Sequence, residues 1–182
     1  GPAGLSSAVA LQKRGLVPIL VELGSTHLDR SQSVAKDLVT GIGGAGLFSD
    51  GKFSFYPSAT NLWRLGDKEA LRHAYSWMIQ LLTAHSNSLP AEVSNSPDEN
   101  ASPSSSVIDQ CTLKPYPSYY LALSERTRIV EELFQTIQGH VLTNTDVQSI
   151  DLQGSARIRV LLQNKISDSY NELFVDGIIF AA

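Results

Sequence analysis

A short glycine-rich segment at the start of the chain has the residue types and spacing to hold a phosphate group. Gly1, Pro2, Ala3 and Gly4 match the last four positions of the pattern G-x-G-x-x-G, in which a glycine turn leads into a helix. Gly1 would let the backbone approach a pyrophosphate, and Gly4 would let the helix pack closely on a sheet. Because the amino-terminal end of a helix favours negative charge, the segment predicts a dinucleotide pyrophosphate site.

An acidic residue lies where this pattern needs one. Glu22 follows Gly4 by 18 residues, near the end of an apolar run over 17–23 that predicts a buried strand. A carboxylate at that place accepts hydrogen bonds from ribose hydroxyls. The elements that must position it are this strand and the helix expected over 2–14, which together form half of a βαβ unit.

A second glycine-rich segment predicts another close approach of backbone to a ligand. Gly41, Gly43, Gly44, Gly46 and Gly51 lie close together, and the Asp-Gly pair that ends with Gly51 predicts a turn. Without side chains in the way, backbone N–H groups of such a loop can converge on anionic oxygens.

These residues resemble the FAD-binding domain of the glutathione-reductase-type flavoproteins, whose fingerprint continues as G-P-A-G-L before a helix. Glu22-Leu23-Gly24 and the later Arg30 follow the same pattern. The segment from Gly41 to Lys52 is similar to the signature G-x-G-G-A-G-x-F-S-D-G-K of the uncharacterised NAD(FAD)-utilising dehydrogenases. The resemblance implies an FAD-dependent oxidoreductase, with a small-molecule substrate and with NAD(P) as a candidate electron donor or acceptor.

The resemblance also implies which residues contact the cofactor. The stretch 143–147 is similar to the one whose backbone meets the adenine, and 176–182 is similar to the strand that leads into a turn near the dinucleotide. The implied FAD-binding residues are Gly1, Pro2, Ala3, Gly4, Glu22, Leu23, Arg30, Gly43, Gly44, Ala45, Gly46, Val147 and Ala181. No catalytic residue is assigned, because in flavoenzymes the cofactor carries the redox chemistry.

The expected fold is α/β: a Rossmann-like FAD/NAD(P)-binding domain with a β-meander and a helical, partly disordered insertion. Residues 1–60 form the dinucleotide half, 61–138 form the insertion with disorder over 86–109, and 139–182 form the meander and a return strand. Because no strand precedes Gly1 and the last apolar run has no turn after it, we expect a fragment truncated at both ends, with the first strand missing.

Local signals define the individual elements of this fold. A helical stripe predicts a helix over 67–85, and Ser124 is a plausible N-cap for another. Strands are expected over 140–151, 156–163 and 172–182.

Composition excludes several classes of protein. The chain has 182 residues and is 42% hydrophobic, which is enough for a core, and 14 basic against 18 acidic residues give a net charge of −4. Nucleic-acid binding is therefore not expected, and no apolar run is long enough to span a membrane. The single Cys111 and the histidines His27, His85 and His140 lack metal-ligand spacing, so no metal is expected. The compartment is unknown, with the cytoplasm or an organellar lumen favoured, and the oligomeric state is open.

Two alternative functions remain open. A plain NAD-binding Rossmann protein would also use Gly1, Gly4 and Glu22, although it would not explain the loop over 41–52 or the meander. A degenerate, non-catalytic flavoprotein relative could act as an interaction module through its Ser/Pro-rich insertion.

Overall fold

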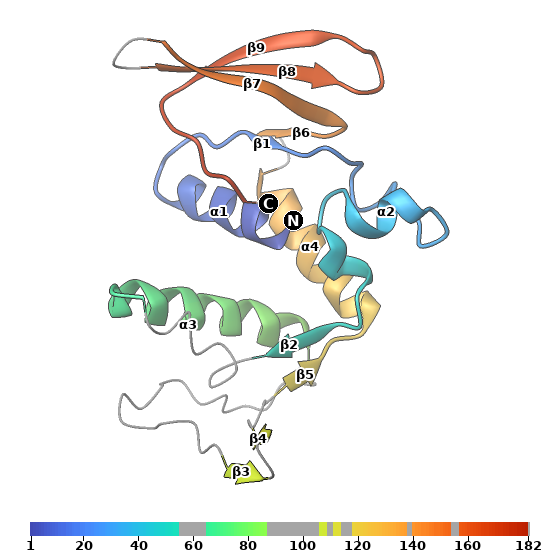
Figure 1. The fold of residues 1–182 in the computed structure, drawn as a ribbon, viewed down its shortest axis with the longest axis vertical. Helices are drawn as coiled ribbons and strands as arrows, with labels where there is room; N and C mark the ends of the chain where they lie inside the picture. The colour runs from blue at the N-terminus through green and yellow to red at the C-terminus, as the bar shows by residue number, and fades with distance from the viewer. Residues whose placement is uncertain are drawn as a thin grey trace. The chain divides into compact units, whose positions relative to one another are not determined.

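The protein is a mixed α/β chain with several small sheets, which confirms the α/β class in outline (Figure 1). It divides into two compact units, Gly1–Ser49 with Val130–Ala182, and Asp50–Ile129. The predicted division into a dinucleotide half (1–60), an insertion (61–138) and a meander with a return strand (139–182) stays a prediction. The computed structural model describes residues 1–54, 65–86, 106–108, 111–113, 118–137, 140–153 and 157–181.

The first unit begins with helix α1, Pro2–Lys13, as the sequence predicts. Pro2 suits the first helical position because it has no N–H group that would go unpaired there. One face of the helix is buried through Gly4, Leu5, Ala8 and Val9. The chain then reverses at Gly15, whose positive φ of 78° is readily adopted by a glycine.

A two-stranded parallel sheet follows α1 and is much shorter than the predicted strand. β1, Leu20–Val21, pairs with β6, Val141–Leu142, and Glu22 N–H adds one more hydrogen bond to the Leu142 carbonyl at 2.9 Å. The expectation of a strand over 17–23 was wrong in length. A strand extends only where a neighbour supplies hydrogen bonds, and β6 offers two residues.

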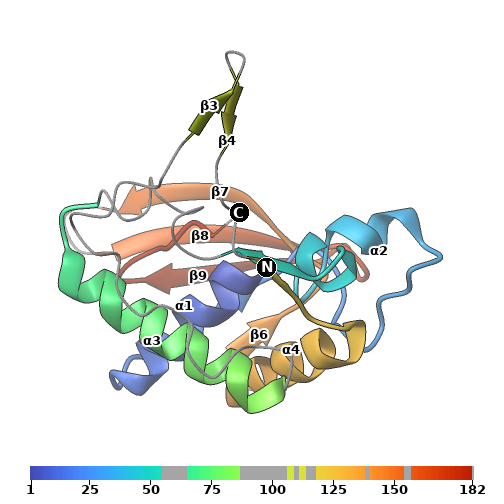
Figure 2. The same ribbon diagram turned by 90° about the horizontal axis from the view of Figure 1, so that it is seen from below.

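The predicted β-meander is present, but its first strand, expected over 140–151, is interrupted: β6 ends at Leu142 and β7 begins at Thr145. β7, Thr145–Gln153, pairs with β8, Arg157–Asn164, which pairs in turn with β9, Tyr170–Val175, and all neighbours are antiparallel. Figures 1 and 2 show the three strands side by side. The expected strand over 172–182 ends early, because Val175 pairs with Ile158 and β8 begins only one residue before it.

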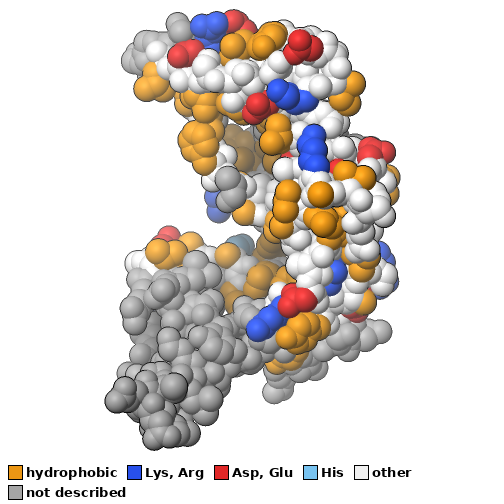
Figure 3. Space-filling model, turned by 45° about the vertical axis from the view of Figure 1, so that its right-hand side comes forward, with side chains coloured by type: hydrophobic (Ala, Val, Ile, Leu, Met, Phe, Trp, Pro, Cys, Tyr) orange, Lys and Arg blue, Asp and Glu red, His pale blue; other side chains and the backbone are white. Residues whose placement is uncertain are grey.

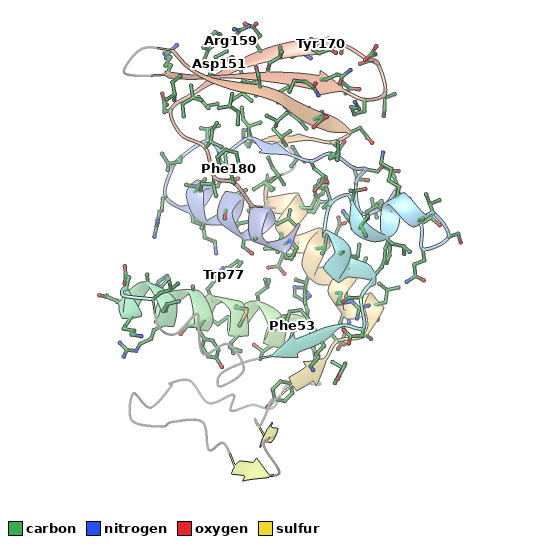
Figure 4. The ribbon with its side chains drawn as sticks, viewed as in Figure 1. Phe53, Trp77, Asp151, Arg159, Tyr170 and Phe180 are labelled. Atoms are coloured by element: carbon green, nitrogen blue, oxygen red, sulfur yellow. The ribbon has the colours of Figure 1, made fainter. Side chains whose placement is uncertain are left out.

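The two faces of the meander differ in character. Val160 and Leu162 of β8 are buried, whereas Arg159 alternates to the other face. There its guanidinium lies 3.8 Å from the Asp151 carboxylate and 2.5 Å from that of Glu172 (Figure 4). Acidic and basic side chains are likewise interspersed on the surface seen in Figure 3.

Helix α4, Leu123–Ile137, begins before the predicted N-cap. Ser124 lies inside the helix, so its assignment as the cap was wrong. The first turn is instead closed by Glu125, whose Oε2 accepts a hydrogen bond from Ala122 N–H at 2.7 Å. A glutamate that reaches back to a preceding N–H group satisfies one of the donors that a helix start leaves free.

The second unit contains a helix and two small antiparallel ribbons. α3, Lys68–His85, is capped by Asp67, which accepts from Ala70 N–H at 2.8 Å, and this confirms the helix predicted over 67–85. β2, Lys52–Ser54, pairs with β5, Ser118–Tyr120.

The second ribbon pairs β3, Ser106–Ile108, with β4, Cys111–Leu113. β3 is therefore a strand within the stretch 86–109, where disorder was expected. The remainder of that stretch, apart from Ser86, lies outside the described residues.

Among the described residues, not one helix is both long enough and apolar enough to cross a bilayer.

The buried face of α1 makes a direct prediction about stability. Leu5 is 0% exposed, whereas Leu16 just after the helix is 56% exposed. We expect Leu5→Ala to lower the free energy of unfolding by about 2–5 kcal/mol, because it removes buried methyl groups and leaves a cavity. Leu16→Ala is the matched control and should change it by less than about 0.5 kcal/mol. Urea denaturation measures both values, and equal effects would contradict the assignment of this face as core.

Candidate functional site

The start of α1 packs closely on the elements around it. A Cβ atom placed on Gly4 would lie 3.2 Å from Cδ1 of Leu20 in β1 and 3.6 Å from Cβ of Ala181. Gly4 therefore allows the close helix–strand approach that the fingerprint predicts, and Ala181 comes to the same place from the other end of the chain. Figures 1 and 2 agree in showing both chain ends near the start of α1.

Glu22 lies immediately after β1, and backbone groups hold its carboxylate. Oε1 accepts hydrogen bonds from the N–H groups of Gly24, at 3.0 Å, and Gly41, at 3.1 Å. Oε2 lies 3.4 Å from the Gly1 nitrogen, and the side chain keeps 13% of its surface exposed. The Glu22 carboxylate, which lies at the position predicted for the acid, thus contacts both glycine-rich segments.

The loop over 41–46 closes against the first glycine segment. Gly41, Gly43 and Gly44 have φ values of 114°, 91° and 60°, in the region that favours glycine. A Cβ on Gly44 would lie 3.0 Å from Cα of Gly1 and 3.4 Å from Cδ of Pro2. The two glycine segments, more than 35 residues apart in sequence, are therefore in contact through backbone atoms.

The continuation of this loop is more open. The short 3-10 helix η1, Ala45–Phe48, follows Gly44, and a Cβ on Gly46 would have nothing within 4 Å. Ala45 is exposed as well. These two residues are exposed, whereas Gly44 packs against the start of α1.

Arg30 binds the backbone of the same loop through its guanidinium group. Its guanidinium donates to the carbonyl of Asp37 through both Nε, at 2.9 Å, and Nη2. Nη1 donates to the carbonyls of Ile42, at 2.7 Å, and Gly41, at 3.5 Å. A rigid fork of donors that binds three carbonyls fixes the course of the backbone between them. Arg30 therefore holds the backbone of the loop, and its predicted contact with a cofactor stays a prediction.

The surroundings of Arg30 affect the charge and the pKa of its guanidinium group. The guanidinium carbon lies 4.9 Å from the centre of the Phe48 ring, a cation–π contact. Burial lowers the pKa of the guanidinium, and the negative charges of Asp37 and Glu22 oppose this shift. The group stays charged at every physiological pH, so its hydrogen bonds to the loop do not depend on pH.

Two residues of the stretch 143–147, Asn144 and Thr145, form backbone hydrogen bonds with the segment around Glu22. Asn144 N–H donates to the Gly24 carbonyl at 2.8 Å, and Thr145 N–H donates to the Glu22 carbonyl at 3.0 Å. Val147 lies further along β7, pairs with Leu162 beside a β-bulge, and is 42% exposed. Leu23 is 41% exposed next to the acid. Adenine contact by Val147 stays a prediction.

The residues after the loop form a turn. Ser49 Oγ donates to the Gly46 carbonyl at 2.9 Å, and Lys52 N–H donates to Asp50 Oδ1 at 3.0 Å. Local hydrogen bonds of this kind are typical of an Asp-initiated turn. Metal-binding groups of three or more His, Cys, Asp or Glu residues are absent from the part of the chain that the structure describes.

The sequence did not indicate a contact beside the site between a buried histidine and a partly exposed glutamate. His27 Nε2 contacts Glu131 Oε2 of α4, and the His27 side chain is fully buried. The two residues are 104 positions apart, so no local spacing could indicate the contact. The donors Gly24 and Gly41 were also missed, although the Glu-x-Gly spacing at 22–24 is a signal that could have found the first of them.

Comparison with known proteins shows a weak likeness to a solved structure. No family model matches the chain, and no curated protein matches it. Among solved structures, the chain is similar to the rebeccamycin biosynthetic enzyme RebC, solved with reduced flavin, with a TM-score of 0.43 and 13% identity. The match covers 97% of this chain but 30% of that chain. A likeness this weak does not establish a shared function.

The contact between the glycine segments predicts a position-specific effect of alanine. Gly44→Ala should lower the free energy of unfolding by about 1–2 kcal/mol, because it adds a side chain at positive φ and presses it against Gly1. Gly46→Ala, two positions on, has open space and should be close to neutral. Chemical denaturation of the two variants decides the matter, and an equal loss in both would contradict the geometry.

The His27–Glu131 contact predicts an acid-sensitive contribution to stability. Hydrogen bonds, first from Gln135 and then from His27, lower the pKa of the Glu131 carboxyl below its ordinary value of 4.5. A lowered carboxyl pKa stabilises the fold at pH values above the ordinary value, and this contribution is lost as the pH falls through the lowered pKa. Because Glu131 is partly exposed, we expect Glu131→Gln to cost about 1 kcal/mol or less at pH 7.

Denaturation curves from pH 7 down to pH 3 measure this contribution. The stability difference between the wild type and Glu131→Gln should shrink towards zero at the acid end. A difference that stays constant over this range would contradict a charge-dependent contact.

Proposed function

We propose that this chain binds FAD and forms the dinucleotide-holding part of an FAD-dependent oxidoreductase. The observation that carries the proposal is the meeting of Gly1, Gly44 and Glu22 in one place. Each of these residues is implied at the cofactor by the sequence resemblance, and they come from three separate segments. A glycine-lined helix start beside a ribose-type acid is the arrangement by which Rossmann-like folds hold dinucleotides.

The residues present fit the adenosine diphosphate part of FAD. Gly4 in the first turn of α1 and Gly44 beside Gly1 have no side chains that would cover the start of the helix. That leaves backbone N–H groups of the first helical turn for a pyrophosphate. Oε1 of Glu22 accepts from two N–H groups, whereas Oε2 has a single long contact, with the Gly1 nitrogen at 3.4 Å, so Oε2 is the atom on which we place a ribose hydroxyl.

In this proposal the chain binds and orients, and bound FAD supplies the redox chemistry by accepting a hydride or an electron pair from a small-molecule substrate. The Glu22 carboxylate fixes the adenosine ribose, and Arg30 keeps the glycine loop in shape against α1. The exposed backbone at Ala45 and Gly46 is the part of the loop that we assign to the flavin side.

The first test is the cofactor of the purified protein. We expect the protein to release FAD when it is purified without added cofactor and then denatured, or to bind FAD on reconstitution. Absorbance and chromatography of the released compound identify it. Competition by NAD⁺ at concentrations similar to FAD would favour a nicotinamide dinucleotide instead, and no binding of either would contradict the proposal.

Two variants test whether this site holds the cofactor. Gly4→Val should abolish flavin retention, because the added side chain would collide with Leu20 and Ala181 and move the start of α1. Glu22→Gln should weaken FAD binding by about tenfold, the loss expected for one hydrogen bond to a charged group. Glu69→Gln, an exposed change on α3, is the control and should retain flavin. Full flavin content in both site variants would remove this site from the account.

A further inference from the structure

His27 is a buried histidine with a single polar contact among the described residues. Its side chain is 0% exposed, Nε2 contacts Glu131 Oε2, and Nδ1 has no hydrogen-bond partner in the part of the chain that the structure describes. The ring meets Phe134 edge-on, with centroids 5.1 Å apart and planes at 66°. Since Glu131 is a carboxylate, Nε2 carries the hydrogen and donates it. The ring is therefore held at one end by α4.

The segment that carries His27 is anchored at the candidate site on both sides. Before it, Gly24 N–H donates to Glu22 Oε1, and the Ser25 carbonyl accepts from Ile42 N–H at 2.9 Å. After it, Arg30 holds the carbonyl of Ile42. His27 thus lies between the acid and the arginine in sequence, and it joins their connecting segment to α4.

The same turn of α4 also supports the glycine loop. A Cβ on Gly43 would lie 3.2 Å from Cγ2 of Val130, the residue next to Glu131. Val130 therefore lies next to the glycine loop, and Glu131 and Phe134 contact His27. A shift of either segment relative to α4 would change the distance between Gly24 and Gly41, the two donors to Glu22.

We infer that His27 is a positioning residue of the dinucleotide site, which acts through its hydrogen bond to Glu131 to fix the two backbone donors that orient the Glu22 carboxylate. This inference rests on the proposed function for its ligand, FAD, but not for its structural part. The structural part is that His27 fixes the amides of Gly24 and Gly41 in the free protein.

Two substitutions of His27 separate packing from positioning. His27→Leu keeps a buried apolar side chain and loses the donor, whereas His27→Gln keeps an amide donor that can reach Glu131. We expect His27→Leu to raise the Kd for FAD about tenfold, the effect of one lost hydrogen bond, and His27→Gln to raise it less than about threefold. Val160→Ala, in the buried face of the meander, lowers stability away from the site and should leave the Kd unchanged.

A readout that a merely structural role would not move comes from combining His27→Leu with Glu22→Gln. If His27 acts through the acid, His27→Leu should weaken FAD binding in the wild-type background and have no further effect in the Glu22→Gln background. Equal fold-losses in both backgrounds would overturn the inference, as would an unchanged Kd in His27→Leu.

The structural part is tested without any ligand. Amide hydrogen exchange of Gly24 and Gly41 in the free protein should become faster in His27→Leu and stay close to wild type in His27→Gln. Unchanged exchange in His27→Leu overturns the inference whatever the ligand. Failure of the wild type to bind FAD, with faster exchange in His27→Leu, overturns the proposed function and leaves His27 as the support of the Glu22 donors.

Discussion

The carboxylate of Glu22 is the interaction on which the rest of the candidate site depends. Its Oε1 gathers the N–H groups of Gly24 and Gly41, and its Oε2 faces Gly1, so three chain segments converge on one side chain. Burying a carboxylate is costly unless hydrogen bonds compensate for its lost hydration, and here backbone donors provide them. Because those donors belong to loops, the position of the acid and the shape of the loops determine each other.

Glycine makes this convergence possible at the points where backbone meets backbone. Gly44 approaches Gly1, and Gly24 approaches Gly41 so closely that a Cβ on Gly24 would lie 2.5 Å from the Gly41 nitrogen. No larger residue could occupy such a position without moving the loop. Supports behind the loops then fix them, with Arg30 holding carbonyls and α4 holding His27 and Gly43. The site is therefore a layer of backbone kept in place by side chains that lie behind it.

How far the sequence predicts this arrangement depends on the range of each interaction. α1 and the Asp67-capped α3 were predictable because their signals are local: periodic apolar residues, Pro2 at a helix start and an N-cap. The fingerprint spacing likewise indicated Gly4 and Glu22. The length of β1 was not predictable, because it depends on how many residues of β6 pair with it. The His27–Glu131 contact was not predictable either, because it also depends on a partner distant in the sequence, 104 positions away.

A crystal structure of the protein with FAD tests the central claim most directly, because it shows which atoms the cofactor contacts. We expect an adenosine ribose hydroxyl within hydrogen-bond distance of Glu22 Oε2, with Oε1 still bound to Gly24 and Gly41, and a pyrophosphate at the N–H groups of the first turn of α1. FAD bound at another place, with the start of α1 and Glu22 free of it, would contradict the account.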